Sequence, residues 1–184
     1  MKLKLLILDV DGVLTDGTKH YNAEHEALTK TFMCKDFTAI KRFMAAGVTV
    51  IMISGDAWNA IMATKRRIDF YCTRVKDNGL DKSQWIEYFS DYYKVDTNEM
   101  MFVGDDYFDL QMFEKLYYTI CPNDAPEIIK NTAWHVLKKS GGQGCLVELY
   151  DLCINKCIIE DAKIDDVLAL DKLEATSEEM SGKL

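Results

Sequence analysis

The sequence predicts a doubly wound parallel α/β sheet. Near-continuous apolar runs, each too short to span a membrane, occur at 3–8, 48–53 and 100–103. Such runs are typical of strands that are buried on both faces. Segments with the apolar spacing of helices separate these runs, and the links between them are short. This alternation of strands and helices is the pattern of a parallel sheet covered by helices on both faces.

The expected elements follow this alternation along the chain. After the first strand, two β-rich runs at 18–21 and 27–32 flank a polar turn and predict a small hairpin that projects from the strand's carboxyl end. Asp36 is expected to cap a helix that runs to about Ala46, and Gly47 to stop it. The later expected elements are strands at 48–53, 69–73, 100–103, 117–121 and 133–137, with helices at about 57–68, from 80, at about 107–115, near 126 and at 142–154.

Composition narrows the class of protein. The chain has 184 residues, of which 48% are apolar and 28% charged, and its formal net charge is −8. This acidic balance argues against nucleic acid or an anionic membrane as a general partner, although a local group of cations can still bind a small anion. No apolar segment is long enough for a membrane span. Six scattered cysteines without a Cys-x-x-Cys pair indicate free thiols and a cytoplasmic protein.

Two carboxylates stand at the end of the first strand. Asp9 and Asp11 follow an apolar run with one residue between them, and Gly12 comes next. Carboxylates beside a buried strand are costly unless a cation or hydrogen bonds compensate them. Two oxygen donors at a strand end suit Mg²⁺. The alternative is a strand that ends in an ordinary Asp-Gly turn, and these residues alone leave both interpretations open.

A second acidic group follows the strand at 100–103. Asp105, Asp106 and Asp109 are three carboxylates within five residues. The negative charges of these carboxylates repel one another unless a cation lies nearby. A capped helix is the alternative interpretation of this stretch by itself.

The two acidic stretches carry a resemblance to a known family. Residues 9–15, Asp-Val-Asp-Gly-Val-Leu-Thr, resemble the DxDGxxT signature of the haloacid dehalogenase-like superfamily, and 104–109 resemble its GDDxxD motif. The resemblance implies phosphoryl transfer through an aspartyl phosphate, with Asp9 as nucleophile and Asp11 as general acid and base. It also implies a magnesium site made by the Asp9 side chain, the Asp11 carbonyl and Asp105. Asp106 and Asp109 would support these ligands or cap a helix.

Two further positions fit the same family. Ser54 and Gly55 end the second apolar run and resemble the motif that holds the phosphate, while Lys82 resembles the lysine that neutralises it. The 45 positions from Asp9 to Ser54 and the 28 from Ser54 to Lys82 leave no room for the cap domain that larger members insert. We therefore expect a core without a cap, whose open site admits a macromolecule or is walled by a neighbouring subunit.

The glycine-rich segment at 141–148 favours a site that is walled by a neighbouring subunit. It resembles the GGxGxxxE segment of 3-deoxy-D-manno-octulosonate 8-phosphate phosphatases and of relatives that act on nine-carbon 9-phosphates. The resemblance implies a sugar-acid phosphate substrate and a homotetramer with active sites at subunit interfaces. Asp56 stands where octulosonate members usually carry arginine, which favours a nine-carbon substrate. The candidate partners for the substrate carboxylate are Lys35, Arg66, Arg67 and Lys139.

The sequence thus predicts a phosphatase domain at 1–160 and an acidic, partly disordered tail at 161–184 that has room for a helix. Two other functions stay open. One is a broader phosphatase or phosphotransferase for small molecules. The other is a non-catalytic regulatory subunit with the same fold.

Overall fold

The computed structural model describes residues 2–74 and 81–181 and confirms the predicted parallel sheet. Six strands lie in the order β5-β4-β1-β6-β7-β8, and every pairing between them is parallel. The first strand therefore lies at the centre of the sheet, between β4 and β6. The strands are β1 (Leu5–Leu8), β4 (Thr49–Ser54), β5 (Asp69–Cys72), β6 (Met100–Val103), β7 (Thr119–Cys121) and β8 (His135–Val136).

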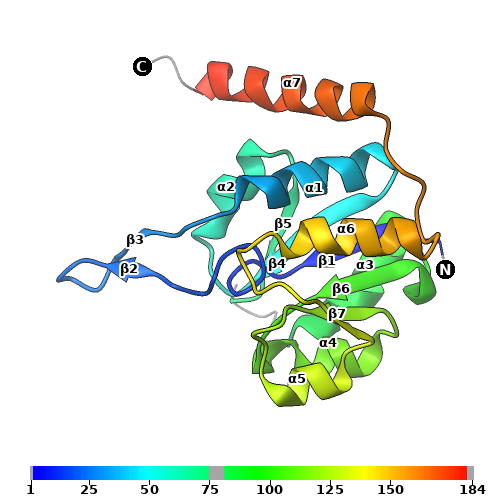
Figure 1. Cartoon of the computed structure of the whole chain (residues 1–184). Helices are drawn as coiled ribbons and strands as arrows, with labels where there is room; N and C mark the ends of the chain where they lie inside the picture. The colour runs from blue at the N-terminus through cyan, green and yellow to red at the C-terminus, as the bar shows by residue number, and fades with distance from the viewer. Residues whose placement is uncertain (1, 75–80, 182–184) are drawn as a thin grey trace.

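Helices cover both faces of this sheet (Figure 1). One face carries α1 (Cys34–Ala45), α2 (Asn59–Lys65) and α6 (Cys145–Asn155), and the other carries α3 (Trp85–Tyr93), α4 (Leu110–Lys115) and α5 (Glu127–Thr132). Side chains of a strand alternate between faces, so Leu6 and Leu8 of β1 pack with α1 and α6. Leu5 and Ile7 pack with α3 and α4. All four are fully buried, as expected for a central strand.

The predicted hairpin is present but short. It consists of β2 (His20–Tyr21) and β3 (Ala27–Thr29), which pair antiparallel and project well beyond the sheet (Figure 1). It returns to the body of the protein at Lys30, whose side chain is fully buried. The hairpin is thus anchored at its base while its strands stay exposed.

The predicted cap of α1 is wrong. The residue before α1 is Met33, which makes no side-chain cap, and Asp36 lies within the first turn. Its carboxylate instead accepts hydrogen bonds from the backbone N–H groups of Gly144, at 3.1 Å, and Leu146, at 2.9 Å. Asp36 therefore caps α6, more than a hundred residues away in the sequence.

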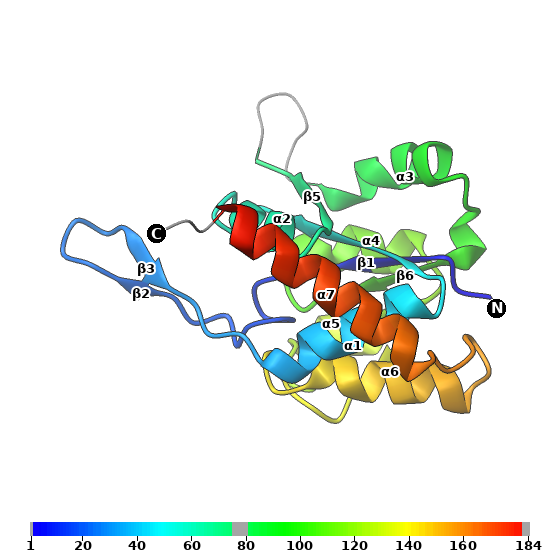
Figure 2. The ribbon, with the colours of Figure 1, turned by 90° about the horizontal axis from the view of Figure 1, so that it is seen from above.

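The acidic C-terminal stretch forms a helix across the outside of the molecule. Helix α7 (Ile164–Ser181) lies over α1 and α2 (Figure 2). Glu174 forms ion pairs with Lys41, at 2.8 Å, and with Arg66, at 2.5 Å. Residues 182–184 lie outside the described residues, and the division of the chain at 160 stays a prediction.

The described segments between the motifs contain only the expected small elements. The hairpin and α1 connect β1 to β4, and α2 and β5 follow β4 before the described chain resumes at Asp81. No helix in the described part of the chain is long and apolar enough to cross a membrane.

Candidate active site

The candidate site lies at the carboxyl ends of the three central strands. Leu8, the last residue of β1, pairs with Met52 of β4 on one side and with Val103 of β6 on the other. Asp9, Ser54 and Asp105 therefore emerge at the same edge of the sheet. Open parallel sheets place their ligand sites at this edge, where neighbouring strands carry the chain to opposite faces.

A buried lysine joins two of the carboxylates. The Nζ atom of Lys82 lies 2.6 Å from Oδ1 of Asp9 and 2.6 Å from Oδ1 of Asp109. Asp81 begins the 3₁₀ helix η1 (Lys82–Gln84) by accepting a hydrogen bond from the Ser83 N–H, which orients the turn that carries Lys82. The three charged groups are nearly inaccessible to solvent, so their attraction is weakly screened.

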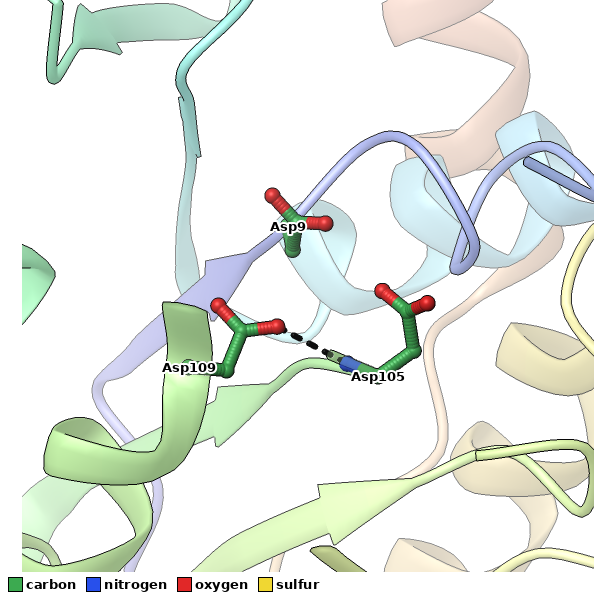
Figure 3. Close-up of side chains that lie close together, drawn as sticks. All are labelled: Asp9, Asp105 and Asp109. Atoms are coloured by element: carbon green, nitrogen blue, oxygen red, sulfur yellow. Dashed lines mark hydrogen bonds between the residues drawn. The ribbon is translucent and has the colours of Figure 1, made fainter. Parts of the chain in front are cut away.

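The side chains of Asp9, Asp105 and Asp109 lie close together (Figure 3). One oxygen of each lies within 4.8 Å of the others. The second oxygen of Asp109 accepts the backbone N–H groups of Asp105, at 2.9 Å, and Asp106, at 3.1 Å. Both oxygens of Asp109 are thus occupied by protein donors. Its role is to hold Lys82 and the turn after β6 in place.

This arrangement would hold a divalent cation. Oδ1 of Asp105 is buried and has no hydrogen-bond partner, which is costly for a carboxylate unless something else binds it. Gly12 lies so close that a Cβ atom there would come within 2.0 Å of Oδ2 of Asp105, and its φ of +91° also favours glycine. The loop after Asp11 can therefore approach Asp105 closely. The hard oxygen donors of Asp9 and Asp105 fit Mg²⁺.

The net effect of burial and neighbouring charges is to raise the pKa values of Asp9, Asp105 and Lys82. Burial raises the pKa of Asp9, the Lys82 ammonium opposes that rise, and Asp109 adds to it, leaving the pKa well above the usual carboxyl range. Burial and the charges of Asp9 and Asp109 raise the pKa of Asp105 further. Burial lowers the pKa of Lys82, but Asp109 and Asp9 outweigh burial and raise it overall. The lysine therefore stays charged, while the carboxyl groups favour ionisation only with more positive charge nearby.

A second network links the hairpin to the site. The Nζ atom of Lys30 lies 2.7 Å from Oδ1 of Asp11, donates to Oδ2 of Asp11 at 3.0 Å, and donates to Asp56 and to Asn59, each at 2.8 Å. Lys19 donates to the same Asp56 oxygen at 2.8 Å. Burial raises the pKa of Asp56, but hydrogen bonds from the two lysines outweigh it and lower the pKa well below its usual range. Asp56 is thus an anchor for the base of the hairpin.

The glycine-rich segment packs on the loop that carries Asp11. The Gly142 N–H donates to the Val13 carbonyl at 2.9 Å. A Cβ atom on Gly141 would lie 1.9 Å from the Gly12 carbonyl oxygen. Thr15 holds the same loop from inside, because its buried hydroxyl accepts the backbone N–H groups of Gly12 and Gly17. The glycines therefore support the loop that carries Asp11 by close backbone contact.

These residues surround a cavity of about 300 Å³. Most predicted site residues lie in its wall, namely Asp9, Asp11, Ser54, Gly55, Asp56, Lys82, Asp105, Asp106 and Asp109. Four candidate carboxylate partners lie outside this wall, namely Lys35, Arg66, Arg67 and Lys139. Arg66 instead pairs with Glu174 and lies over the ring of Phe37. The proposed roles of these four cations receive no support from the cavity.

Sequence reasoning missed other residues of the site. The wall also contains Lys19, Thr73, Arg74 and Phe108, while Lys30 and Asn59 contact Asp11 from behind it. Thr73 and Arg74 follow β5 directly, so the rule that sites lie beyond strand ends would have identified them. Lys30 and Asn59 gave no comparable signal, because their contacts depend on how the hairpin and α2 dock.

Comparisons with known proteins identify the family and the fold of this chain. A family model described as haloacid dehalogenase-like hydrolase matches residues 57–149, which include Lys82 and Asp105. The 3-deoxy-D-manno-octulosonate 8-phosphate phosphatase of Haemophilus influenzae is 33% identical over 152 residues, 83% of this chain and 83% of that protein. The solved cobalt-bound structure of the enzyme named deoxy-D-mannose-octulosonate 8-phosphate phosphatase from Haemophilus influenzae matches with a TM-score of 0.75 and 31% identity, covering 84% of this chain and 88% of that one.

A third relative shares the fold. The 3-deoxy-D-manno-octulosonate 8-phosphate phosphatase of Moraxella catarrhalis, solved with a magnesium ion, a phosphate ion and a KDO molecule, matches with a TM-score of 0.74 and 24% identity. The match covers 83% of this chain and 86% of that one. The family model and the extent of the 33% identity together show that this chain belongs to the haloacid dehalogenase-like hydrolases.

Proposed function

We propose that this protein is a magnesium-dependent phosphatase that hydrolyses the phosphomonoester of a 3-deoxy-2-ulosonic sugar acid, an octulosonate 8-phosphate or a nonulosonate 9-phosphate. The observation that carries the proposal is the Lys82–Asp9 ion pair in the wall of a cavity of about 300 Å³, beside the unpartnered oxygen of Asp105. This arrangement supplies a nucleophile, a fixed cation and a place for a second cation. Phosphoryl transfer needs these three components.

Asp9 is the proposed nucleophile. One of its oxygens attacks phosphorus, the bond from phosphorus to the sugar oxygen breaks, and an aspartyl phosphate forms. Asp11 gives a proton to the departing sugar oxygen and then takes one from the water that cleaves the aspartyl phosphate. Inorganic phosphate leaves, and both side chains return to their starting forms, Asp9 as the carboxylate and Asp11 as the protonated acid.

The remaining groups hold the phosphoryl oxygens. Lys82 lies against the proposed nucleophile, so its charge is placed to neutralise the transferring group. Ser54 and Gly55 border the same cavity from the end of β4. Mg²⁺, held by the Asp9 and Asp105 side chains and the Asp11 carbonyl, would supply further charge neutralisation when bound. The Haemophilus influenzae relative was solved in a cobalt-bound form, which supports the proposal that this chain also binds a divalent cation.

The substrate class rests on the relatives and on the glycine-rich segment. The Haemophilus influenzae relative bears the name of an octulosonate 8-phosphate phosphatase. Asp56 favours the nine-carbon branch by resemblance, although in this structure its carboxylate is occupied by Lys19, Lys30 and the Trp58 N–H. A comparison of octulosonate 8-phosphate with nonulosonate 9-phosphates as substrates therefore decides the number of substrate carbons.

We also infer that four copies assemble, with each exposed hairpin reaching a neighbour and completing its site. The projecting strands β2 and β3 support this, because His20, Tyr21 and Thr29 are exposed in the single chain. Size-exclusion chromatography with light scattering tests it, and a monomer would contradict the shared site. Six free cysteines support a cytoplasmic location.

The first experiment is phosphate release with Mg²⁺ across a panel of substrates, run beside Asp9→Asn. The panel holds octulosonate 8-phosphate, two nonulosonate 9-phosphates and common hexose phosphates. Strong preference for one ulosonate phosphate, abolished in folded Asp9→Asn, is the expected result. Weak and even activity across the panel would indicate a broad phosphatase. Absence of activity with Mg²⁺ bound would favour a non-catalytic subunit.

A further inference from the structure

Arg74 enters the site from the neighbouring strand. Cys72, the last residue of β5, pairs with Ser54 of β4, and the Thr73 N–H donates to the Ser54 carbonyl at 3.0 Å. This pairing extends the ladder by one residue beyond β5. Arg74 therefore leaves the sheet at the same edge as Ser54 and Gly55.

The guanidinium of Arg74 lies directly over Gly55. A Cβ atom on Gly55 would come within 3.0 Å of Nε and 3.5 Å of Cζ of Arg74. The side chain lies in the wall of the cavity that also contains Asp9 and Lys82. It is exposed to solvent, so it borders the open part of that cavity.

Arg74 differs from the other cations of the wall in its contacts. Lys82 is held between Asp9 and Asp109, and Lys19 is held by Asp56. Among the residues that the structure describes, 2–74 and 81–181, Arg74 makes no ion pair and no hydrogen bond. It is thus a cation at the substrate cavity whose donors face no protein carboxylate in that part of the chain.

We propose that Arg74 binds the carboxylate of the substrate. The inference rests on the proposed function and adds a specificity residue to it. The phosphoryl group already has Lys82 and a cation site, while the acid end of the substrate needs a positive partner of its own. Guanidinium suits this role, because its planar N–H groups match the two oxygens of a carboxylate. None of the four cations expected from the sequence lies in this wall.

The test compares Arg74→Gln with Arg67→Gln. Arg67 is also exposed and is removed from the cavity wall, so its replacement changes the net charge equally without touching the site. Each variant is assayed with the ulosonate phosphate that the unmodified protein prefers and with p-nitrophenyl phosphate, which has no carboxylate. We expect kcat/KM of Arg74→Gln to fall about 10-fold to 100-fold for the ulosonate phosphate, mainly through KM, because a charged hydrogen-bond pair is lost. Hydrolysis of p-nitrophenyl phosphate and the melting temperature should stay unchanged, as should every property of Arg67→Gln.

The possible failures are distinguishable. An equal loss for both substrates, with weaker inhibition by inorganic phosphate, would place Arg74 on the phosphoryl group and overturn the proposal. Unchanged kinetics of Arg74→Gln with the ulosonate phosphate would also overturn it, while leaving the proposed function intact. If the unmodified protein hydrolyses p-nitrophenyl phosphate but no ulosonate phosphate, the proposed substrate class fails, and the role of Arg74 fails with it.

Discussion

The Nζ atom of Lys30 lies 2.7 Å from Oδ1 of Asp11 and donates a hydrogen bond to Oδ2 at 3.0 Å, so the base of the hairpin directly holds the proposed general acid. The lysine side chain is completely buried and also lies 5.1 Å from the centre of the Trp58 ring. Asn59 donates to the same Asp11 oxygen at 3.0 Å. Asp11 is therefore oriented by two adjacent groups, one from the base of the hairpin and one from α2, which also bind each other at 2.8 Å.

Replacing Lys30 with Met should impair proton transfer more than binding. Met keeps most of the volume of the side chain but removes the charge that fixes Asp11. General acid–base catalysis contributes about 10²–10⁴-fold, and we expect kcat for a sugar phosphate to fall by about 10-fold to 100-fold. The loss should be much smaller for p-nitrophenyl phosphate, because its phenolate leaves without a proton. Steady-state kinetics with both esters measures this difference.

Lys19→Met is the matched control for that prediction. Lys19 also pairs with Asp56, at 2.8 Å, but lies 3.7 Å from Asp11. The Lys19→Met substitution should lower kcat less than Lys30→Met does. Its effect on kcat should not depend on the leaving group. If Lys30→Met affected both esters equally, the positioning role of Lys30 would be wrong.

Much of the site could be predicted because strand ends are visible in a sequence. Asp9, Ser54 and Asp105 each follow an apolar run, and parallel pairing brings such ends to one edge of the sheet. The order of the elements follows from the same pattern. The motif that contains Lys82 could be matched, although its contact with Asp109 depends on the turn after β6.

The rest depends on tertiary contacts between distant segments. Lys30 reaches Asp11 only because the base of the hairpin docks against Asn59 of α2, and Asp36 caps α6 across 108 positions of sequence. Arg66 is an exposed cation by pattern, but α7 supplies Glu174 to pair with it. No local propensity encodes which carboxylate a surface arginine meets.

Magnesium should stabilise the protein more at high pH. The pKa is raised to about 7 for Asp9 and about 9 for Asp105 in the folded protein, above the ordinary value of 3.8. A carboxyl group with a raised pKa stabilises the fold below its ordinary pKa, and this stability is lost as pH rises through the raised value. A bound cation favours the ionised form of the carboxyl groups, so Mg²⁺ should restore the stability that is lost at high pH. At a hundredfold excess over Kd, binding adds about 2.7 kcal/mol, which corresponds to about 5–10 °C for a chain of this size.

Thermal unfolding with MgCl₂ and with EDTA, near pH 6 and near pH 9, measures this effect. The rise in melting temperature on adding Mg²⁺ should be larger near pH 9. Asp105→Asn, which cannot ionise at that position, is the control and should lose most of the response. A response that is equal at both pH values would contradict the carboxylate site.

Asp36→Ala should destabilise the fold although Asp36 lies outside the cavity wall. The substitution leaves the N–H groups of Gly144 and Leu146 without their acceptor at the buried start of α6. Two such bonds to a charged group are worth about 2–4 kcal/mol together, allowing for the cost of burying the carboxylate. Urea unfolding should report this loss. Asp96→Ala, an exposed position at the start of the 3₁₀ helix η2 (Thr97–Glu99), should cost about 1 kcal/mol or less.

Gly141→Ala should reduce turnover by displacing the catalytic loop. The new Cβ atom would lie 1.9 Å from the Gly12 carbonyl oxygen and 2.9 Å from that of Thr15, so one of the two loops must move. Movement of Gly12 would shift Asp11 and increase the distance between Gly12 and the Asp105 carboxylate. Displacements on the ångström scale can cost about 100-fold in rate, and we expect kcat to fall by about 10-fold or more. The affinity for Mg²⁺, measured by calorimetry, should weaken in parallel.

Gly47→Ala separates this clash from a general loss of stability. Gly47 has a φ of +82° and nothing within 4 Å of its Cβ position, so alanine there is strained but meets no neighbour. It should cost about 1–2 kcal/mol of stability and leave kcat and Mg²⁺ affinity unchanged. Gly141 has no positive φ, so its effect should come from contact alone. If both variants lost stability and neither lost turnover, the glycine-rich segment would serve the fold without supporting the catalytic loop.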